Sequence, residues 1–229
     1  MDNFLDKIFF RSRNFDYISQ NLIDLTIQTP ANRIFEALNT YSESSEVRYV
    51  GGCVRKVIKK QIVDDIDLAT NLKPSEVCDA LKKKEINFYE TGIDHGTITA
   101  IIDKYKYEIT SLRKDVSTDG RHAKVEFSSD WKEDAARRDF SINSIYSDKD
   151  GNLFDPYDGK KDLESGNINF IGDAENRIKE DYLRILRYVR FFINYSNQSH
   201  NPKIIKIIKK NIGGVSRLSS ERLLDEFKK

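Results

Sequence analysis

Residues 48–70 read RYVGGCVRKVIKKQIVDDIDLAT. Its first apolar run ends in the glycine pair Gly51–Gly52, and a basic segment leads to a second apolar run that carries Asp65 and Asp67. Short apolar runs bounded by glycine are typical of buried strands, and the segment between them has apolar residues at helical spacing. The stretch therefore predicts a strand, a tight turn, a short helix and a second strand.

The rest of the chain predicts a change from mixed strands and helices to helices alone at about residue 170. The predicted elements are a helix at 32–41, a helix at 74–84 with Ser75 as N-cap, two β-rich runs within 95–113, a polar loop at 114–130, a helix that begins at 130, and one long helical segment over 173–195. Strands alternate with helices at first, and then only helices follow. This order predicts an α/β domain followed by a helical extension.

Composition limits the class of protein. The 229 residues are enough for one large domain, or for one domain with a helical extension. The net charge of +1 does not indicate a polyanionic partner for the whole chain, although KIIKIIKK at 203–210 predicts a local basic patch. Two cysteines, Cys53 and Cys78, are too few for a disulfide framework, so we expect small core residues in a reducing compartment. With no long apolar run and no clear signal or transit peptide in residues 1–15, we expect no membrane association.

The acidic residues of the second strand predict a metal site. Residues i and i+2 of a strand point to the same face, so Asp65 and Asp67 project together. Two adjacent carboxylates repel each other unless a cation lies between them, and Mg²⁺ takes one or two carboxylates together with substrate phosphates. Glu108 interrupts a β-rich run, and an adjacent antiparallel strand would bring it to the same cleft. Three carboxylates can hold two metal ions about 3.5–4 Å apart, as in phosphoryl transfer. An isolated DxD is more often a solvated strand end, so both interpretations stay open at this point.

The glycine turn predicts a phosphate contact only in combination with the aspartates. Gly51 and Gly52 would let the backbone approach a phosphate, and the following helix would offer its N–H groups. Arg55 would then reach an anionic oxygen. Taken alone, two glycines followed by an arginine favour a plain turn. The phosphate interpretation gains weight because Asp65 lies only ten residues beyond Arg55.

Together, GGCVRK (51–56) and DIDLAT (65–70) resemble the GGxVRD and DxDxxT motifs of the class II tRNA nucleotidyltransferases and bacterial poly(A) polymerases, which belong to the polymerase-β-like superfamily. The resemblance covers nearly the whole chain from about residue 45. It includes HGTIT (95–99), EITSLRKD (108–115), DGRHAKVEF (119–127), RRDFSINSI (137–145), FDPYDGKKDL (154–163), IGDAENRIKEDYLRILRYVRF (171–191) and LSSERLLDE (218–226). One departure is Lys56, which replaces the usual Asp of GGxVRD. It would alter a helix-capping contact or one that orients Arg55, whereas the metal carboxylates are intact.

The resemblance implies a fold and a reaction. The fold is α/β, a polymerase-β-like nucleotidyltransferase head with a small mixed sheet flanked by helices over residues 1–170, followed by an all-helical neck over 171–229. The reaction is nucleotidyl transfer from CTP and ATP to the 3′ end of tRNA, with Mg²⁺ as cofactor and pyrophosphate as product. The implied catalytic residues are Asp65, Asp67 and Glu108, with Asp65 and Asp67 on the metal. The implied nucleotide-binding residues are Gly51, Gly52, Arg55, Arg138, Asp139, Asp181, Arg184, Arg187 and Arg190.

Two of the implied contacts have alternatives in the residues themselves. In RRD (137–139) the family contacts nucleotide ribose and phosphate, which we transfer to Arg138, with Asp139 as ribose partner. The alternative is a surface ion pair between Glu133 and Arg137, which are spaced i, i+4.

Asp181 and Arg184 lie in a segment that is apolar over most of its circumference, so each needs a partner. One alternative is an ion pair between them, since i and i+3 are neighbours on a helix. The other is base recognition: a carboxylate only accepts and a guanidinium only donates, which suits the amino group and ring nitrogen of cytosine and adenine and excludes uracil and guanine. The family's EDxxR motif is understood in this way. Arg187 and Arg190 continue at i+3 steps and resemble residues that contact the phosphates.

The segment DGRHAKVEF resembles the flexible loop of CCA-adding enzymes, which is shortened in CC-adding relatives, so the resemblance favours a full CCA enzyme. A poly(A) polymerase or a CC- or A-adding relative is the alternative.

The chain stops at ERLLDEFKK, within a predicted neck helix, whereas family members continue with helical regions that clamp the tRNA. A catalytic fragment that binds nucleotide but needs those helices for tRNA, or a degenerate RNA-binding remnant, is therefore a further hypothesis. The amino-acid sequences of these motifs most resemble the mitochondrial and alphaproteobacterial branch of the family, so we expect a bacterial cytoplasmic or mitochondrial location.

Overall fold

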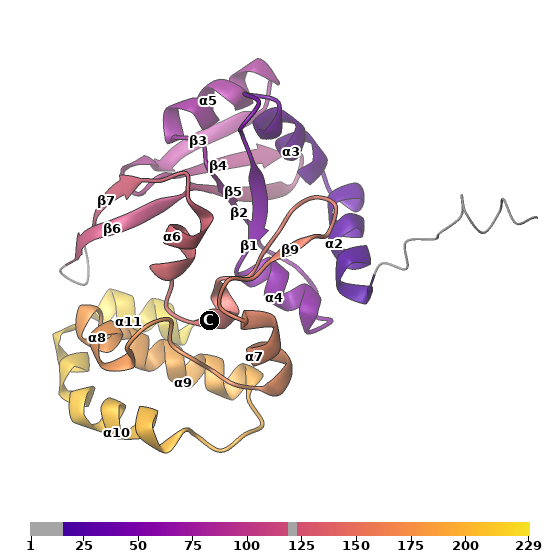
Figure 1. Ribbon diagram of the computed structural model, residues 1–229. Coiled ribbons are helices and arrows are strands. Elements are labelled where there is room, and N and C mark those ends of the chain that lie inside the picture. Colours follow the sequence, from indigo (N-terminus) through magenta and orange to yellow (C-terminus); the bar gives the residue numbers. More distant parts are fainter. Residues whose placement is uncertain (1–15, 119–122) are drawn as a thin grey trace, which may run out of the picture.

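The computed structural model describes residues 16–118 and 123–229; residues 1–15, and 119–122 at the start of DGRHAKVEF, lie outside this range. Figure 1 shows two halves, a sheet with its covering helices and a group of helices packed below it. The strands are β1 (Val47–Val50), β2 (Ile66–Thr70), β3 (Asn87–Gly92), β4 (Thr97–Ile102), β5 (Tyr105–Ser111), β6 (Arg113–Thr118), β7 (Ala123–Phe127), β8 (Tyr146–Ser147) and β9 (Leu153–Phe154). The helices of the sheet half are α2 (Tyr17–Gln28), α3 (Ala31–Asn39), α4 (Gly52–Ile58), α5 (Pro74–Lys83), α6 (Trp131–Ala136) and α7 (Gly159–Ser165), with 3₁₀ turns at Ile93–His95 and Ser141–Asn143.

Seven strands form one mixed sheet in the order β3-β4-β5-β2-β1-β8-β9. β2 and β5 run parallel, and the other neighbouring pairs run antiparallel. The mixed α/β class is therefore confirmed. The expected antiparallel arrangement of the Glu108 strand beside the Asp67 strand is wrong. The chain leaves β2 through α5 and β3, and the β4–β5 hairpin then turns β5 back into the direction of β2.

Helices α3 and α5 pack together beside the sheet because each has one apolar stripe. In α3 the buried residues recur at helical spacing, and Phe35 packs on Tyr49 of β1 with 4.9 Å between ring centroids. The prediction of Ser75 as N-cap of α5 is wrong. The helix begins at Pro74, and Glu76 closes its first turn by accepting the N–H of Lys73 at 2.7 Å.

The helical half consists of α8 (Ala174–Glu180), α9 (Leu183–Tyr195), α10 (Pro202–Asn211), a 3₁₀ turn at Ile212–Arg217, and α11 (Ser220–Phe227). The prediction of one helix over 173–195 is wrong, because the chain breaks between α8 and α9. Asp181 is extended there, with φ −154°, and its carboxylate accepts the N–H of Leu183 at 3.1 Å. Aspartate favours this capping role over a helix interior, and the apolar pattern alone does not reveal it.

The polar segment predicted as a loop contains a two-stranded hairpin, so that prediction is wrong for most of 114–130. β6 and β7 pair antiparallel, apart from the main sheet, with Lys114 opposite Glu126. The ion pair between these two side chains measures 3.3 Å. A hairpin that stands outside the main sheet does not need an apolar face, so its sequence does not show strong strand periodicity.

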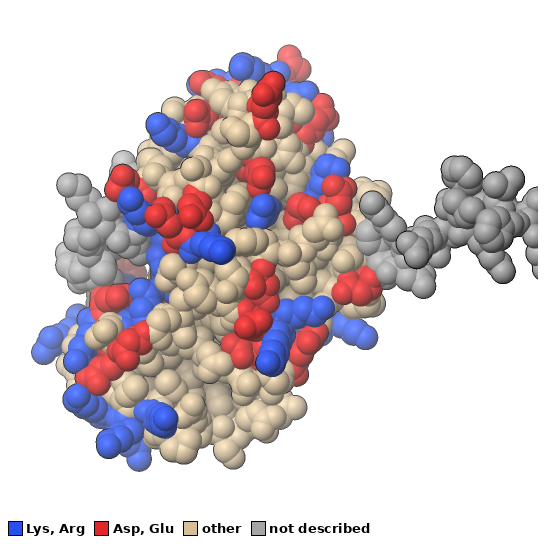
Figure 2. Space-filling model, in the orientation of Figure 1, with Lys and Arg blue, Asp and Glu red and all other residues tan. Residues whose placement is uncertain are grey.

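Charges of both signs are mixed over most of the face in Figure 2, as the small net charge leads one to expect. Lysine and arginine gather at the lower left, where α10 lies. Lys203, Lys206 and Lys209 of α10 are exposed, whereas Lys210 contacts Glu175 at 2.7 Å. Within the described ranges, none of the helices has the length and apolar character needed to cross a bilayer.

Candidate active site

Asp67 and Glu108 lie opposite each other on the parallel strands β2 and β5. Asp65 is exposed immediately before β2, and Asp67 is half-buried. In the described part of the chain, neither the Asp65 nor the Asp67 carboxylate has a hydrogen-bond or ion-pair partner. Glu108 accepts from Lys106 Nζ at 2.6 Å. The register therefore brings a partnerless carboxylate and Glu108 to neighbouring positions of the sheet.

The acidic groups influence each other electrostatically. Burial raises the pKa of Asp67, and the negative charges of Glu108 and Asp65 raise it further. The guanidinium groups of Arg138 and Arg55 act in the opposite direction but do not cancel the effect. A raised carboxyl pKa means that the surroundings disfavour the ionised form until a cation compensates its charge.

These residues are suited to a hard divalent cation. Partnerless carboxylate oxygens are ligands that Mg²⁺ accepts, and it commonly keeps waters and substrate oxygens in its other positions. Gly52 lies directly beside Asp67, because a Cβ at Gly52 would be in van der Waals contact with Asp67 Oδ2, at 3.6 Å. Among residues 16–118 and 123–229, however, no three His, Cys, Asp or Glu side chains come together as a metal cage. Asp65, Asp67 and Glu108 therefore do not form a preassembled three-carboxylate cluster, and Asp65 and Asp67 are the two carboxylates without a partner among the described residues.

The glycine turn places the start of α4 between charged groups. Gly51 has φ +64° and ψ −111°, a backbone conformation that glycine adopts readily and residues with a Cβ rarely do. A Cβ there would also lie 3.7 Å from the Asn143 carbonyl oxygen and 3.8 Å from Arg138 Nη1. The first residues of α4 thus have the Arg138 guanidinium on one side and the Asp67 carboxylate on the other.

Arg55, which the sequence analysis predicts to contact a phosphate, lies against α9 of the helical half. Its Nη1 donates to Asn143 Oδ1, and its guanidinium lies 5.0 Å from the ring centroid of Phe191 and 5.2 Å from that of Tyr195. Its Nε is buried without a hydrogen-bond partner among the described residues. Arg55 thus links α4 to α9.

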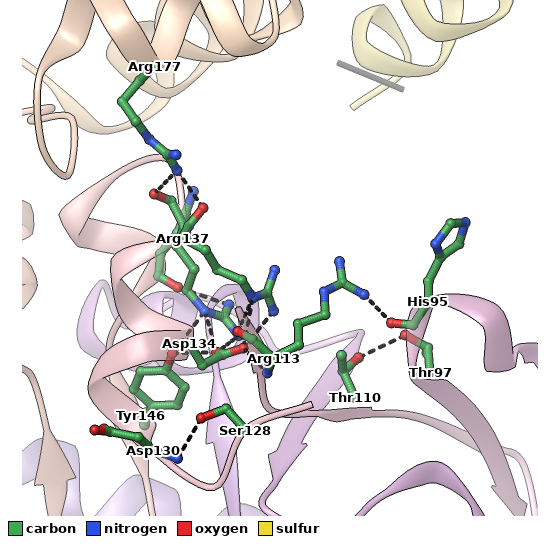
Figure 3. Close-up of polar contacts among 12 residues, drawn as sticks. His95, Thr97, Thr110, Arg113, Ser128, Asp130, Asp134, Arg137, Tyr146 and Arg177 are labelled. Atoms are coloured by element: carbon green, nitrogen blue, oxygen red, sulfur yellow. Dashed lines mark hydrogen bonds and ion pairs between the residues drawn. The ribbon is translucent and has the colours of Figure 1, made fainter. Parts of the chain in front are cut away.

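Asp134, which the sequence analysis did not single out, is the centre of a buried ion cluster (Figure 3). Its side chain is 1% exposed. Oδ1 accepts from Arg137 Nη2 at 2.6 Å, and Oδ2 accepts from Arg138 Nη2 at 3.0 Å and from the Tyr146 hydroxyl at 2.7 Å. Burial alone would raise the pKa of Asp134, but the charges of Arg138 and Arg137 outweigh it and hold that pKa far below its ordinary value.

The surface ion pair proposed as an alternative for Arg137 is wrong, because Arg137 pairs with Asp134 and Glu133 accepts from Ser128 Oγ at 2.5 Å. The signal for Asp134 was present in the sequence. It precedes the two arginines by three and four residues, the spacing at which side chains of a helix meet.

Arg177 of α8 extends the Asp134 cluster toward the helical half. Its Nη2 donates to the carbonyl oxygens of Arg137 and Arg138, the latter at 2.7 Å. Figure 3 shows Arg177 reaching toward Arg137 from the opposite side to Asp134. The same main-chain segment is therefore held from the sheet half and from the helical half.

Asp139 and Arg187 form a second link between the halves. Asp139 Oδ2 accepts from Arg187 Nε at 2.6 Å, and Oδ1 accepts from Asn143 Nδ2 at 2.8 Å and from the Phe140 N–H at 2.9 Å. Burial alone would raise the pKa of Asp139, but the Arg187 charge and these hydrogen bonds lower it. Both oxygens are thus already bonded, so a ribose contact would have to share them.

Glu226 of α11 is a further residue that the sequence analysis missed. It is 4% exposed, and its Oε1 accepts from Arg190 Nε at 2.7 Å. Its Oε2 lies 3.8 Å from Arg187 Nη1. Its position between two arginines depends on how α11 packs on α9, and sequence spacing does not give that packing.

Asp181 and Arg184 are not partners of each other, so the ion-pair alternative is wrong. Asp181 Oδ2 accepts from Arg222 Nη2 at 2.8 Å. Arg184 Nη1 donates to Glu180 Oε2 at 2.6 Å and to the Arg177 carbonyl oxygen at 2.7 Å. In the described part of the chain, Nε and Nη2 of Arg184 make no hydrogen bond. Each side chain therefore keeps some hydrogen-bonding capacity.

Comparison with known proteins identifies the family of this chain. The family described as Poly A polymerase head domain matches residues 47–169, more than half of the chain. The mitochondrial CCA tRNA nucleotidyltransferase 1 of Homo sapiens is 43% identical over 190 residues, 82% of this chain and 44% of that protein. The CCA-adding enzyme of Lactobacillus johnsonii is 39% identical over 186 residues, 80% of this chain and 46% of that protein.

Among solved structures, the CCA-adding enzyme of Bacillus stearothermophilus in complex with CTP has a TM-score of 0.75 and 29% identity, over 86% of this chain and 46% of that chain. This chain spans about half the length of the relatives it matches. The family match includes the glycine turn, the acidic strand, Glu108 and the Asp134 cluster. The chain therefore belongs to the poly A polymerase head-domain family.

Proposed function

We propose that this chain is the head, residues 1–170, and the helical neck, residues 171–229, of a tRNA nucleotidyltransferase that adds C, C and A to the 3′ end of tRNA without a nucleic-acid template. The observation that carries the proposal is the pair of partnerless carboxylates, Asp65 and Asp67, beside Glu108. The names of the human and Lactobacillus relatives support it. One relative is mitochondrial and the other bacterial, so we propose a mitochondrial or bacterial cytoplasmic location.

In the proposed reaction, the 3′-hydroxyl oxygen of the tRNA bonds to the α-phosphorus of CTP or ATP and loses its proton to solvent. The bond from that phosphorus to the oxygen that bridges to the β-phosphate breaks, and pyrophosphate leaves. Asp65 and Asp67 would hold Mg²⁺, and Glu108 would complete the acidic edge. When bound, the ion lowers the pKa of the attacking hydroxyl and stabilises the leaving group.

The basic residues have two proposed roles. Arg138, whose position is set by Asp134, and the main chain of Gly51 and Gly52 would position the triphosphate. Arg187 and Arg190 would contact the nucleotide through the guanidinium N–H groups that their carboxylate partners leave free. Arg55 and Asp139 would also contact the nucleotide. Both already have partners in the structure, Asn143 and Phe191 for Arg55 and Arg187 for Asp139, so they would keep these contacts while they bind it.

The proposed base selection uses Asp181 and Arg184 at the break between α8 and α9. An ionised carboxylate accepts about four hydrogen bonds, so Asp181 can receive a cytosine or adenine amino group while it keeps Arg222 and the Leu183 N–H. Arg184 would donate to the ring nitrogen through Nε or Nη2. Uracil and guanine present the reverse order of donor and acceptor, which leaves both contacts unmade.

Asp181→Ala is expected to reduce discrimination against UTP and GTP about 10- to 100-fold, because each unpaired group costs roughly 1–3 kcal/mol. Single-nucleotide incorporation with each NTP measures the ratio of kcat/KM values. Arg222→Ala is the matched control, since it removes the same ion pair but leaves the carboxylate, and it is expected to keep C/A selectivity. Full selectivity in Asp181→Ala would show that this residue does not read the base.

A primer-extension assay tests the proposed function. It offers tRNA transcripts that end before the first C, the second C or the final A, with Mg²⁺ and each labelled NTP separately and together. Addition of two C and one A, followed by a stop, would establish CCA addition. Continuous addition of A would indicate a poly(A) polymerase, and addition of C alone a CC-adding enzyme. Binding of CTP and ATP without addition would indicate a catalytic fragment that needs further helices for tRNA.

A further inference from the structure

We propose that Lys56 and Asp64 act as one positioning pair that holds the main chain at Asp65, and that Asp64 compensates for the positive charge of the lysine in GGCVRK. Position 56 is acidic in the family's GGxVRD motif, so the lysine introduces a charge of the opposite sign. The catalytic importance of the pair rests on the proposed function. The geometry of the pair and its effect on cation binding do not depend on the proposed function.

The pair connects the two elements that border the acidic site. Lys56 lies in the second turn of α4, and Asp64 lies in the segment that joins α4 to β2. Lys56 Nζ donates to Asp64 Oδ1, and the same oxygen accepts the N–H of Asp65 at 2.9 Å. A single carboxylate oxygen thus joins a side chain of α4 to the main chain of a proposed metal ligand.

Among the described residues, few hydrogen bonds hold the segment around Asp65, and Val63 is the residue of this segment that packs on the core. Lys60 has φ +58°, and residues 61–65 form no helix or strand. The Gln61 N–H donates to the Lys56 carbonyl oxygen at 2.8 Å, so Lys56 holds the beginning of this segment through its main chain and the end through its side chain. Because the Asp65 carboxylate has no partner among the described residues, its place depends on its main chain.

The charge of Lys56 is matched to Asp64. An aspartate at position 56 would face Asp64 with like charge, beside Asp65 and Asp67, and would place four carboxylates near one another. Restoring the family's usual residue is therefore expected to harm this chain. The Lys56 and Asp64 side chains are 25% and 68% exposed, and such pairs add little to global stability. We expect loss of the pair to displace Asp65 and leave the fold intact.

Binding of Mn²⁺, followed by electron paramagnetic resonance, tests the pair without tRNA or nucleotide. Lys56→Met removes the pair and one positive charge. Lys59→Met, at the C-cap of the same helix, removes one positive charge and no ion pair to any described residue, and is the matched control. A pure charge effect would make both variants bind Mn²⁺ more tightly. The positioning pair predicts that Lys56→Met raises the half-saturating Mn²⁺ concentration about three- to tenfold, the effect of one lost hydrogen bond. Binding by Lys56→Met as tight as that of Lys59→Met would overturn the proposal.

Nucleotide incorporation tests the compensation. Lys56→Asp is expected to lower CTP incorporation. Lys56→Asp with Asp64→Asn is expected to recover part of the loss, because the Asn side-chain oxygen still accepts the Asp65 N–H and the repulsion between two carboxylates is removed. Incorporation by Lys56→Asp equal to that of the wild type would overturn the compensation. If the wild type itself transferred no nucleotide, the proposed function would fail, while the Mn²⁺ comparison would still decide whether the pair positions Asp65.

Discussion

Asp67→Asn is expected to reduce nucleotide transfer about a thousandfold, the kinetic equivalent of roughly 4 kcal/mol, while the protein stays folded. Asp67 is a half-buried carboxylate without a partner among the described residues, next to Glu108 and within reach of the Arg138 charge. The amide keeps the shape of the side chain but removes the negative charge that would hold a cation. Single-turnover incorporation of CTP into a tRNA transcript measures the loss.

The same substitution makes an opposite prediction for stability. The pKa of Asp67 is raised in the folded protein, so its contribution to stability is present below the ordinary carboxyl pKa and is lost as the pH rises through the folded value. At neutral pH the ionised group is therefore unfavourable in the fold, and Asp67→Asn is expected to melt at the same temperature as the wild type or higher.

A control shows whether the effect comes from the position of Asp67 or from the change of any aspartate to asparagine. Asp79→Asn changes the same side chain at an exposed position of α5 and is expected to leave both activity and melting temperature unaltered. If Asp67→Asn kept more than about a tenth of the wild-type rate, the loss would be too small for a metal ligand, and Asp67 would have to be replaced by another carboxylate in the mechanism.

Local pattern was sufficient to predict the elements that place the acidic site. Short apolar runs around Gly51–Gly52 predicted β1, α4 and β2, because glycine punctuation and strand length are local properties. The direction of β5 was not predictable in the same way, since it depends on how many turns the chain makes between β2 and β5. The break at Asp181 was missed because a capping aspartate inside an apolar pattern looks like one polar position of a continuous helix.

The charged residues show the same limit more clearly. Motif resemblance singled out Arg55 and Arg190 but not Asn143 and Glu226, which hold them, and it did not pair Asp139 with Arg187. Asn143 and Glu226 lie far from those arginines in sequence, so only the packing of α4, α9 and α11 brings them together. The function of a charged side chain depends on which of its atoms remain free, and that information is tertiary.

Asp134→Ala is expected to lower the free energy of unfolding by about 3–5 kcal/mol, because removing one partner of a buried ion cluster leaves the others uncompensated. Asp134 is 1% exposed and bonds Arg137, Arg138 and Tyr146, so none of these can find water in its place without moving. For a chain of this size, that loss corresponds to a fall in melting temperature of roughly 10 °C. Differential scanning calorimetry or urea unfolding measures it.

Two further variants and the pH dependence separate the cluster from a general effect of mutating α6. Glu133→Ala removes the neighbouring exposed carboxylate and is expected to change stability by at most about 0.5 kcal/mol. Asp134→Asn keeps an acceptor without the charge and is expected to lie between Asp134→Ala and the wild type. The folded pKa of Asp134 is depressed, so its stabilisation is present above the ordinary carboxyl value of about 3.9 and is lost as the pH falls below it. The difference between Asp134→Ala and the wild type should therefore narrow in acid, and a difference that stayed constant from neutral to strongly acidic pH would show that the charge of Asp134 is not what stabilises the cluster.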